Sequence, residues 1–138
     1  MVDRAAQRSN SRTRHRSQAS TNTLQGKTIV IDPGHGGSNS GAVANGTRES
    51  DFNLAASLAL QDKLRKAGAK VVMTRTADTT DAPEGNPLSA ELQKRVDIAE
   101  ANQADVFVSI HANSNPDKKI AGAMTFRQYR VSAWLVML

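Results

Sequence analysis

Short apolar runs alternate with longer segments of helical pattern between residues 27 and 113. The runs 27–32 (KTIVID), 69–75 (AKVVMTR) and 104–113 (ADVFVSIHAN) are rich in β-branched residues, which is typical of strands buried on both faces. Segments 50–68 and 88–103 have the residue pattern of helices. Strands that alternate with helices predict an α/β fold with a mostly parallel sheet and helices on both faces.

Both predicted helices carry signals at their ends. Ser50 is a suitable N-cap for the first helix, and Gly68 is a suitable stop. Asn86 is a candidate cap for the second helix, with Pro87 at its first position. The face of the second helix expected to pack on the sheet consists of Leu88, Leu92, Val96 and Ala99.

Two histidines stand at corresponding places in this pattern. His35 follows the first strand, and His111 lies at the end of the third. The carboxyl ends of parallel strands form one edge, and open α/β sheets bind ligands outside that edge. We therefore expect these two histidines to lie close together. The remaining histidine, His15, lies in the N-terminal segment.

A carboxylate would complete a metal site with these histidines. Catalytic zinc sites commonly use two histidines and one carboxylate, and Glu49 is the residue that we select. It directly precedes the predicted cap of the first helix, and the Gly/Asn/Ser-rich loop before it can fold back over the sheet edge. A carboxylate near a helix N-terminus is also common without a metal. Asp32 is a rival ligand, although its place before Pro33 suits a turn or a role in orienting His35.

The basic character of the chain belongs to its N-terminal segment. The formal net charge is +5, and residues 1–25 contain five arginines and one aspartate. This segment has few bulky apolar residues, so we expect a disordered basic arm. It has no aromatic residue for base stacking, and we expect no nucleic-acid partner. No apolar stretch follows the arginines, so no signal peptide is visible, and no apolar run approaches the ~20 residues of a membrane span.

Residues 26–126 resemble the zinc-dependent N-acetylmuramoyl-L-alanine amidases of the amidase-3 family. The resemblance rests on blocks in the family's order: IVIDPGHGG, GTRESDFNLAASLALQDKL, VVMTR, LQKRVDIAEANQADVFVSIHAN and GAMTF. It implies that His35, Glu49 and His111 bind Zn²⁺. It also implies cleavage of peptidoglycan, at the amide between N-acetylmuramic acid and the L-alanine of the stem peptide. The expected location is the cell wall, the periplasm or the cell exterior, and we expect a monomer.

One departure from the family concerns the part of the chain after His111. The family continues to a second glutamate that serves as general base, whereas Asp117 is the only carboxylate here after His111. Residues 26–126 therefore resemble a truncated catalytic domain, and residues 127–138 an atypical end. We expect a sheet that is incomplete at the C-terminus and has an unprotected edge. No catalytic residue is assigned besides the metal ligands.

Two functions stay open on this evidence. The chain is either an amide hydrolase or a zinc- or wall-binding homologue with little or no turnover. Asn113 either contacts substrate or closes a turn, and Arg95 is expected to be a structural or solvated charge.

Overall fold

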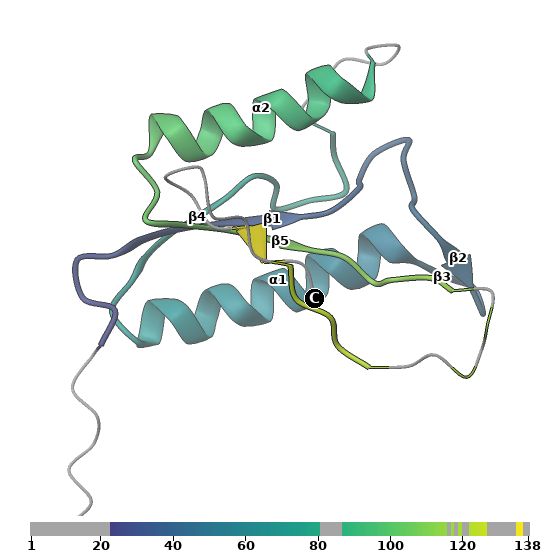
Figure 1. Cartoon of the computed structure of the whole chain (residues 1–138), viewed down its shortest axis with the longest axis horizontal. Coiled ribbons are helices and arrows are strands. Elements are labelled where there is room, and N and C mark those ends of the chain that lie inside the picture. Colours follow the sequence, from purple (N-terminus) through teal and green to yellow (C-terminus); the bar gives the residue numbers. More distant parts are fainter. Residues whose placement is uncertain are drawn as a thin grey trace, which may run out of the picture.

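A four-stranded parallel sheet forms the centre of the computed structural model, which describes residues 23–80, 87–115, 117, 119, 122–126 and 135–136. The strand order is β4-β1-β5-β6, with the bounds Lys70–Met73, Thr28–Pro33, Val106–Ile110 and Leu135–Val136. Helices α1 (Glu49–Lys66) and α2 (Leu88–Ala101) lie on opposite faces of the sheet (Figure 1). The predicted α/β fold class is therefore confirmed.

Strand β1 occupies the middle of the sheet. It pairs in parallel with β4 on one side and with β5 on the other. Because side chains alternate along a strand, Ile29 and Ile31 face α1, while Val30 and Asp32 face α2. The cluster beneath α1 is apolar and consists of Ile29, Ile31, Ala69, Val71 and Ile110. The opposite face is more polar, since Asp32 is buried there with Arg95 of α2.

The N-cap of helix α1 lies two residues earlier than the sequence predicts. Arg48 is its N-cap residue and makes no side-chain cap, while Ser50 is buried within the first turn. The predicted Ser50 cap is therefore wrong. Main-chain carbonyls satisfy the first N–H groups instead: Glu49 donates to Ala42, and Ser50 donates to Ser40. The predicted stop at Gly68 is confirmed, because that residue has a φ of 95° and donates to the Arg65 carbonyl.

Helix α2 packs through residues other than those predicted. It begins at Leu88 with Pro87 as its N-cap residue, and Asn86 lies outside the described residues. Its buried residues are Arg95 and Ala99. Of the predicted apolar face only Ala99 is buried, since the side chains at 88, 92 and 96 are 60%, 52% and 41% exposed. The helix is held by the ion pair of Arg95 with Asp32 rather than by its leucines.

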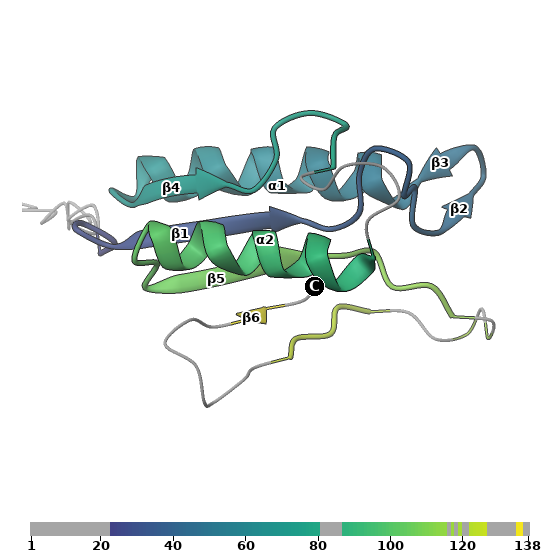
Figure 2. The same ribbon diagram turned by 90° about the horizontal axis from the view of Figure 1, so that it is seen from above.

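The C-terminal residues cover part of the sheet edge that the sequence predicts to be open. Strand β6 pairs in parallel with β5, placing Leu135 beside Phe107 and Val136 beside Val108. Figure 2 shows β6 alongside β5 when the molecule is viewed from above. The prediction of an open edge is therefore wrong along this short pairing. An extended segment that runs in a suitable direction can pair with a strand through main-chain hydrogen bonds alone.

The beginning of the described chain already packs on the domain. Residues 1–22 of the predicted arm lie outside the described residues. Residues 23–26 form turns, and Leu24 packs against the apolar cluster while its N–H donates to the Ala67 carbonyl. In the described part of the chain, neither helix is long and apolar enough to cross a membrane.

Shortening a side chain should destabilise the protein by different amounts on the two faces of the sheet. Ile31→Ala removes a fully buried side chain, so we expect it to lower the free energy of unfolding by about 2–5 kcal/mol. Leu92→Ala alters an exposed side chain, so its effect should stay within about 0.5 kcal/mol. Urea denaturation of both variants measures the difference. A loss at Leu92 as large as that at Ile31 would contradict the exposure of this part of α2.

Candidate metal centre

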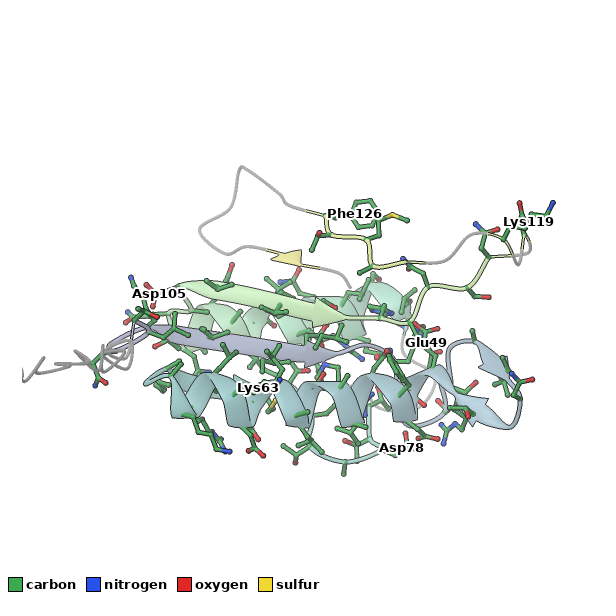
Figure 3. All side chains as sticks on the ribbon, turned by 90° about the horizontal axis from the view of Figure 1, so that it is seen from below. Glu49, Lys63, Asp78, Asp105, Lys119 and Phe126 are labelled. Carbon is green, nitrogen blue, oxygen red and sulfur yellow. The ribbon has the colours of Figure 1, made fainter. Side chains whose placement is uncertain are left out.

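Three side chains converge at the carboxyl edge of the sheet. His35 follows β1, His111 follows β5, and Glu49 begins α1. Figure 3 shows Glu49 at the arrowhead ends of the strands and Asp105 at their opposite ends. The sequence predicts this convergence, and the structure brings the same three side chains together.

The distances between these side chains are short. Glu49 Oε1 lies 3.3 Å from His35 Nε2 and 3.1 Å from His111 Nδ1. The two imidazole rings meet edge to face, with centroids 4.8 Å apart and an interplanar angle of 81°. One ligand atom from each residue lies within 4.8 Å of the others. Both histidines are partly open to solvent, whereas the Glu49 side chain is only 9% exposed.

A β-hairpin delivers Glu49 to this position. Strands β2 (Val43–Ala44) and β3 (Thr47–Arg48) pair antiparallel through a turn at Asn45 and Gly46, whose φ angles of 52° and 75° suit a tight hairpin. The hairpin folds the loop back over the sheet edge, as the sequence predicts. Glu49 thus begins α1 at the point where β1 and β5 end.

Hydrogen bonds hold the Glu49 carboxylate in its ionised form. Oε2 accepts the Ala42 N–H at 3.0 Å, and Oε1 accepts the Ala112 N–H at 3.1 Å. Burial acts to raise the pKa of Glu49, but the Ala42 N–H, electrostatic attraction by the nearby His35 ring and the His111 hydrogen bond outweigh it. The pKa of Glu49 therefore lies below its ordinary value. An ionised carboxylate is the form that binds a metal ion.

Two glycines leave room for the converging side chains. A Cβ on Gly34 would overlap the imidazole ring of His111. Gly41 has a φ of 65°, and a Cβ there would lie 2.6 Å from His35 Cδ2 and 2.7 Å from Glu49 Oε2. Both positions therefore exclude larger residues. Sequence reasoning did not assign these glycines to the site, because their role depends on contacts between distant segments.

Asp32 is not part of the cluster. Its carboxylate faces α2 and accepts hydrogen bonds from Thr74 Oγ1 at 2.7 Å, Arg95 Nη1 at 2.7 Å and Ser109 Oγ at 2.8 Å. It makes no direct contact with the His35 ring, whose Nδ1 instead faces Asn39 Oδ1. The three ligand atoms that converge do not include one from Asp32, which instead binds Arg95, the donor to the His35 carbonyl. The alternation of side chains along β1 turns Asp32 to the other face.

Two buried arginines fix the main chain around His35. Arg95 donates to the carbonyls of Pro33 and His35, so it is a structural charge and not a solvated one. The sequence pattern does not single out Arg75, which is the last residue of the predicted strand 69–75 and lies two residues after β4. Its guanidinium binds main-chain carbonyls of four residues: Pro33, Gly34, Ser50 and Ala77. Because Gly34 precedes His35 and Ser50 follows Glu49, Arg75 links the two segments that carry these side chains.

An open pocket of about 250 Å³ adjoins Glu49. The hairpin forms one side, the loop after β5 forms another, and Phe52 of α1 contributes an apolar wall. Asn113 and Ser114 add polar groups. Asn113 thus lines the pocket that Glu49 also lines. Of the three converging side chains, Glu49 is the one that lines this pocket.

The fold and the site together define an α/β protein with a candidate metal centre at the carboxyl edge of its sheet. Residues 29–133 match the family described as N-acetylmuramoyl-L-alanine amidase (Amidase_3). The chain belongs to this family.

Two similar proteins are described as amidases. The germination-specific N-acetylmuramoyl-L-alanine amidase of Bacillus subtilis is 40% identical over 108 residues, which cover 75% of this chain and 46% of that protein. The probable cell wall amidase LytH of Staphylococcus aureus is 40% identical over 111 residues, covering 78% of this chain and 33% of that protein.

Solved structures agree with this assignment. The CwlD amidase of Clostridioides difficile, solved in complex with the GerS lipoprotein, has a TM-score of 0.66 and 33% identity. The match covers 76% of this chain and 57% of that one. This chain spans about half or less of the length of the curated relatives it matches.

The linking role of Arg75 predicts a specific loss of stability. Arg75→Lys replaces a buried, forked donor by a single ammonium group, which cannot reach all of the same carbonyls. We expect the free energy of unfolding to fall by about 1–3 kcal/mol. Arg65→Lys, at an exposed position on α1, is the matched control and should stay within about 0.5 kcal/mol. Equal urea midpoints for the two variants would contradict the role assigned to Arg75.

Proposed function

We propose that this chain holds a zinc ion with His35, Glu49 and His111 and belongs to the machinery that cleaves peptidoglycan. The bond concerned is the amide between N-acetylmuramic acid and the L-alanine of the stem peptide, and the location is the cell wall, the periplasm or the cell exterior. The convergence of two imidazoles and one ionised carboxylate at the sheet edge is the observation that carries this proposal.

The donor set fits zinc. Ligands of one tetrahedral zinc ion, each at about 2.0–2.2 Å from it, lie roughly 3.3–3.5 Å from one another. Glu49 Oε1 lies 3.3 Å from His35 Nε2, which matches that spacing, and 3.1 Å from His111 Nδ1, which is slightly shorter; all three ligand atoms lie within 4.8 Å of one another. Two imidazoles and one carboxylate form a ligand set that catalytic zinc sites use, with a remaining position open to water or substrate.

The residues of the chain have separate tasks in this proposal. Glu49 supplies the negative charge, and the N–H groups of Ala42 and Ala112 keep its two oxygens oriented. When bound, zinc supplies a Lewis acid that activates water and polarises an amide carbonyl. The pocket beside Glu49 admits the amide, with Phe52 as an apolar wall and Asn113 as a hydrogen-bonding group.

A second candidate is metal and wall binding with little turnover. It is favoured because nearby carboxylates are already paired with arginines: Asp32 and Glu91 with Arg95, and Asp78 with Arg48. A general base must accept a proton from water and pass it to the leaving amine. These paired carboxylates are poor candidates for that task, and Glu84 lies outside the described residues.

Zinc binding tests the proposed centre. The full chain should bind about one zinc ion, and His35→Ala, Glu49→Ala and His111→Ala should each abolish tight binding, since three protein ligands are usual for such a site. Isothermal titration of the metal-free protein measures this. Glu100→Ala, at an exposed position of α2, is the control for loss of a carboxylate and should bind zinc as the parent does. Unchanged binding by His111→Ala would exclude the proposed ligand set.

Release of stem peptides from purified peptidoglycan separates the two candidates. We expect the 138-residue chain to be a poor amidase, and a fusion to the C-terminal half of the Bacillus subtilis relative to be faster by about 10²–10⁴-fold, the usual contribution of a positioned general acid/base. His35→Ala in the fusion should remove the gain. A comparable rate for the chain alone would show that one of its own carboxylates serves as the base.

A further inference from the structure

The side chain of Asn39 faces Nδ1 of His35, whereas the other ring nitrogen, Nε2, faces Glu49. We propose that Asn39 is a positioning residue, which keeps a proton on His35 Nδ1 and so leaves Nε2 as the nitrogen that binds the metal. This inference rests on the proposed function and names a further residue that the zinc centre requires.

The orientation of the Asn39 amide follows from its second partner. Asn39 Oδ1 lies 3.0 Å from His35 Nδ1 and also accepts the main-chain N–H of Gly41 at 3.1 Å. A main-chain N–H can only donate, so the atom that faces Gly41 must be the oxygen and not the amide nitrogen. The same oxygen faces His35, and an oxygen of this kind can only accept. His35 Nδ1 must therefore carry the proton.

The consequence for the other ring nitrogen is direct. A neutral imidazole has one N–H and one lone pair, so a proton on Nδ1 places the lone pair on Nε2. Nε2 is the atom that lies 3.3 Å from Glu49 Oε1, within the proposed ligand set. A histidine that binds a metal commonly donates its other N–H to an acceptor, which fixes both the tautomer and the ring orientation.

The main chain holds Asn39 in place for this task. Gly36 and Asn39 exchange hydrogen bonds, with Gly36 N–H donating to Asn39 O at 2.8 Å and Asn39 N–H donating to Gly36 O at 3.1 Å. Arg48 donates to the Gly37 carbonyl, and Asp78 accepts the Gly37 N–H. The turn that presents Asn39 is thus fixed from both ends, and the Asn39 side chain need only reach across this turn.

The two histidines therefore require different supports. His111 directs its Nδ1 toward Glu49 Oε1, whereas His35 directs its Nε2 there. The His111 ring lies against Gly34, which leaves no space for a side chain at that position. The His35 ring is instead oriented by a hydrogen bond, and so its alignment depends on one replaceable side chain.

Substitution of Asn39 tests the proposal with zinc alone as the probe. Asn39→Ala should weaken zinc binding by about 10- to 100-fold, the usual effect of losing the acceptor behind a ligating histidine. Asn39→Asp keeps an acceptor oxygen and should bind zinc within a few-fold of the parent or more tightly. Ser38→Ala, at an exposed position in the same turn, is the matched control and should leave affinity unchanged. Chelator competition measures all four dissociation constants.

The results distinguish the role of Asn39 from the zinc site itself. If Asn39→Ala binds zinc like the parent while His35→Ala does not, the role of Asn39 is wrong and the centre stands. If His35→Ala also binds like the parent, the centre itself is wrong. An equal loss in Ser38→Ala would assign the effect to the turn and overturn the role of Asn39.

A spectroscopic measurement on the unaltered protein does not depend on how the variants fold. Long-range ¹H–¹⁵N correlation spectra of the zinc-loaded parent protein should show a protonated His35 Nδ1. A proton on His35 Nε2 would overturn the proposal.

Discussion

The buried guanidinium groups of Arg75 and Arg95 hold the chain reversal at the end of β1, and the rest of the site depends on this interaction. A reversal at the edge of a sheet leaves main-chain carbonyls that must be satisfied when they are buried. Here the carbonyls of Pro33, Gly34 and His35 accept from these two arginines. Asp32 and Glu91 balance the charge of Arg95, so the network stabilises the turn without leaving Arg95 unpaired.

This network also explains the unequal packing of the two helices. α1 covers an apolar cluster, whereas α2 is tied to the sheet by an ion pair and exposes much of its apolar surface. A buried, hydrogen-bonded ion pair fixes the relative orientation of its two groups, whereas an apolar contact does not. The polar face of the sheet therefore sets where α2 lies, and through the His35 carbonyl it also sets where the candidate metal centre begins.

The centre itself combines rigid and adjustable parts. Gly34 and Gly41 allow rings and carboxylate to approach closely, and main-chain N–H groups orient Glu49. The His35 ring, in contrast, takes its orientation from Asn39. In the proposed function, affinity for the metal then depends on the ligand residues and also on Gly34, Asn39 and Gly41, which do not bind the metal themselves.

The sequence by itself determined three strands and two helices in their order along the chain, the shared edge of His35 and His111, and the place of Glu49 beside them. These inferences depend on periodicity and on chain direction in parallel sheets, both of which are local or topological properties. Only the tertiary structure decided that Asp32 turns away from the histidines, that Arg75 and Arg95 hold their loop, and that α2 buries Arg95 instead of its leucines. The physical reason is that such roles depend on which distant groups satisfy each buried charge and carbonyl. That pairing is absent from any short window of sequence and exists only once the segments have come together.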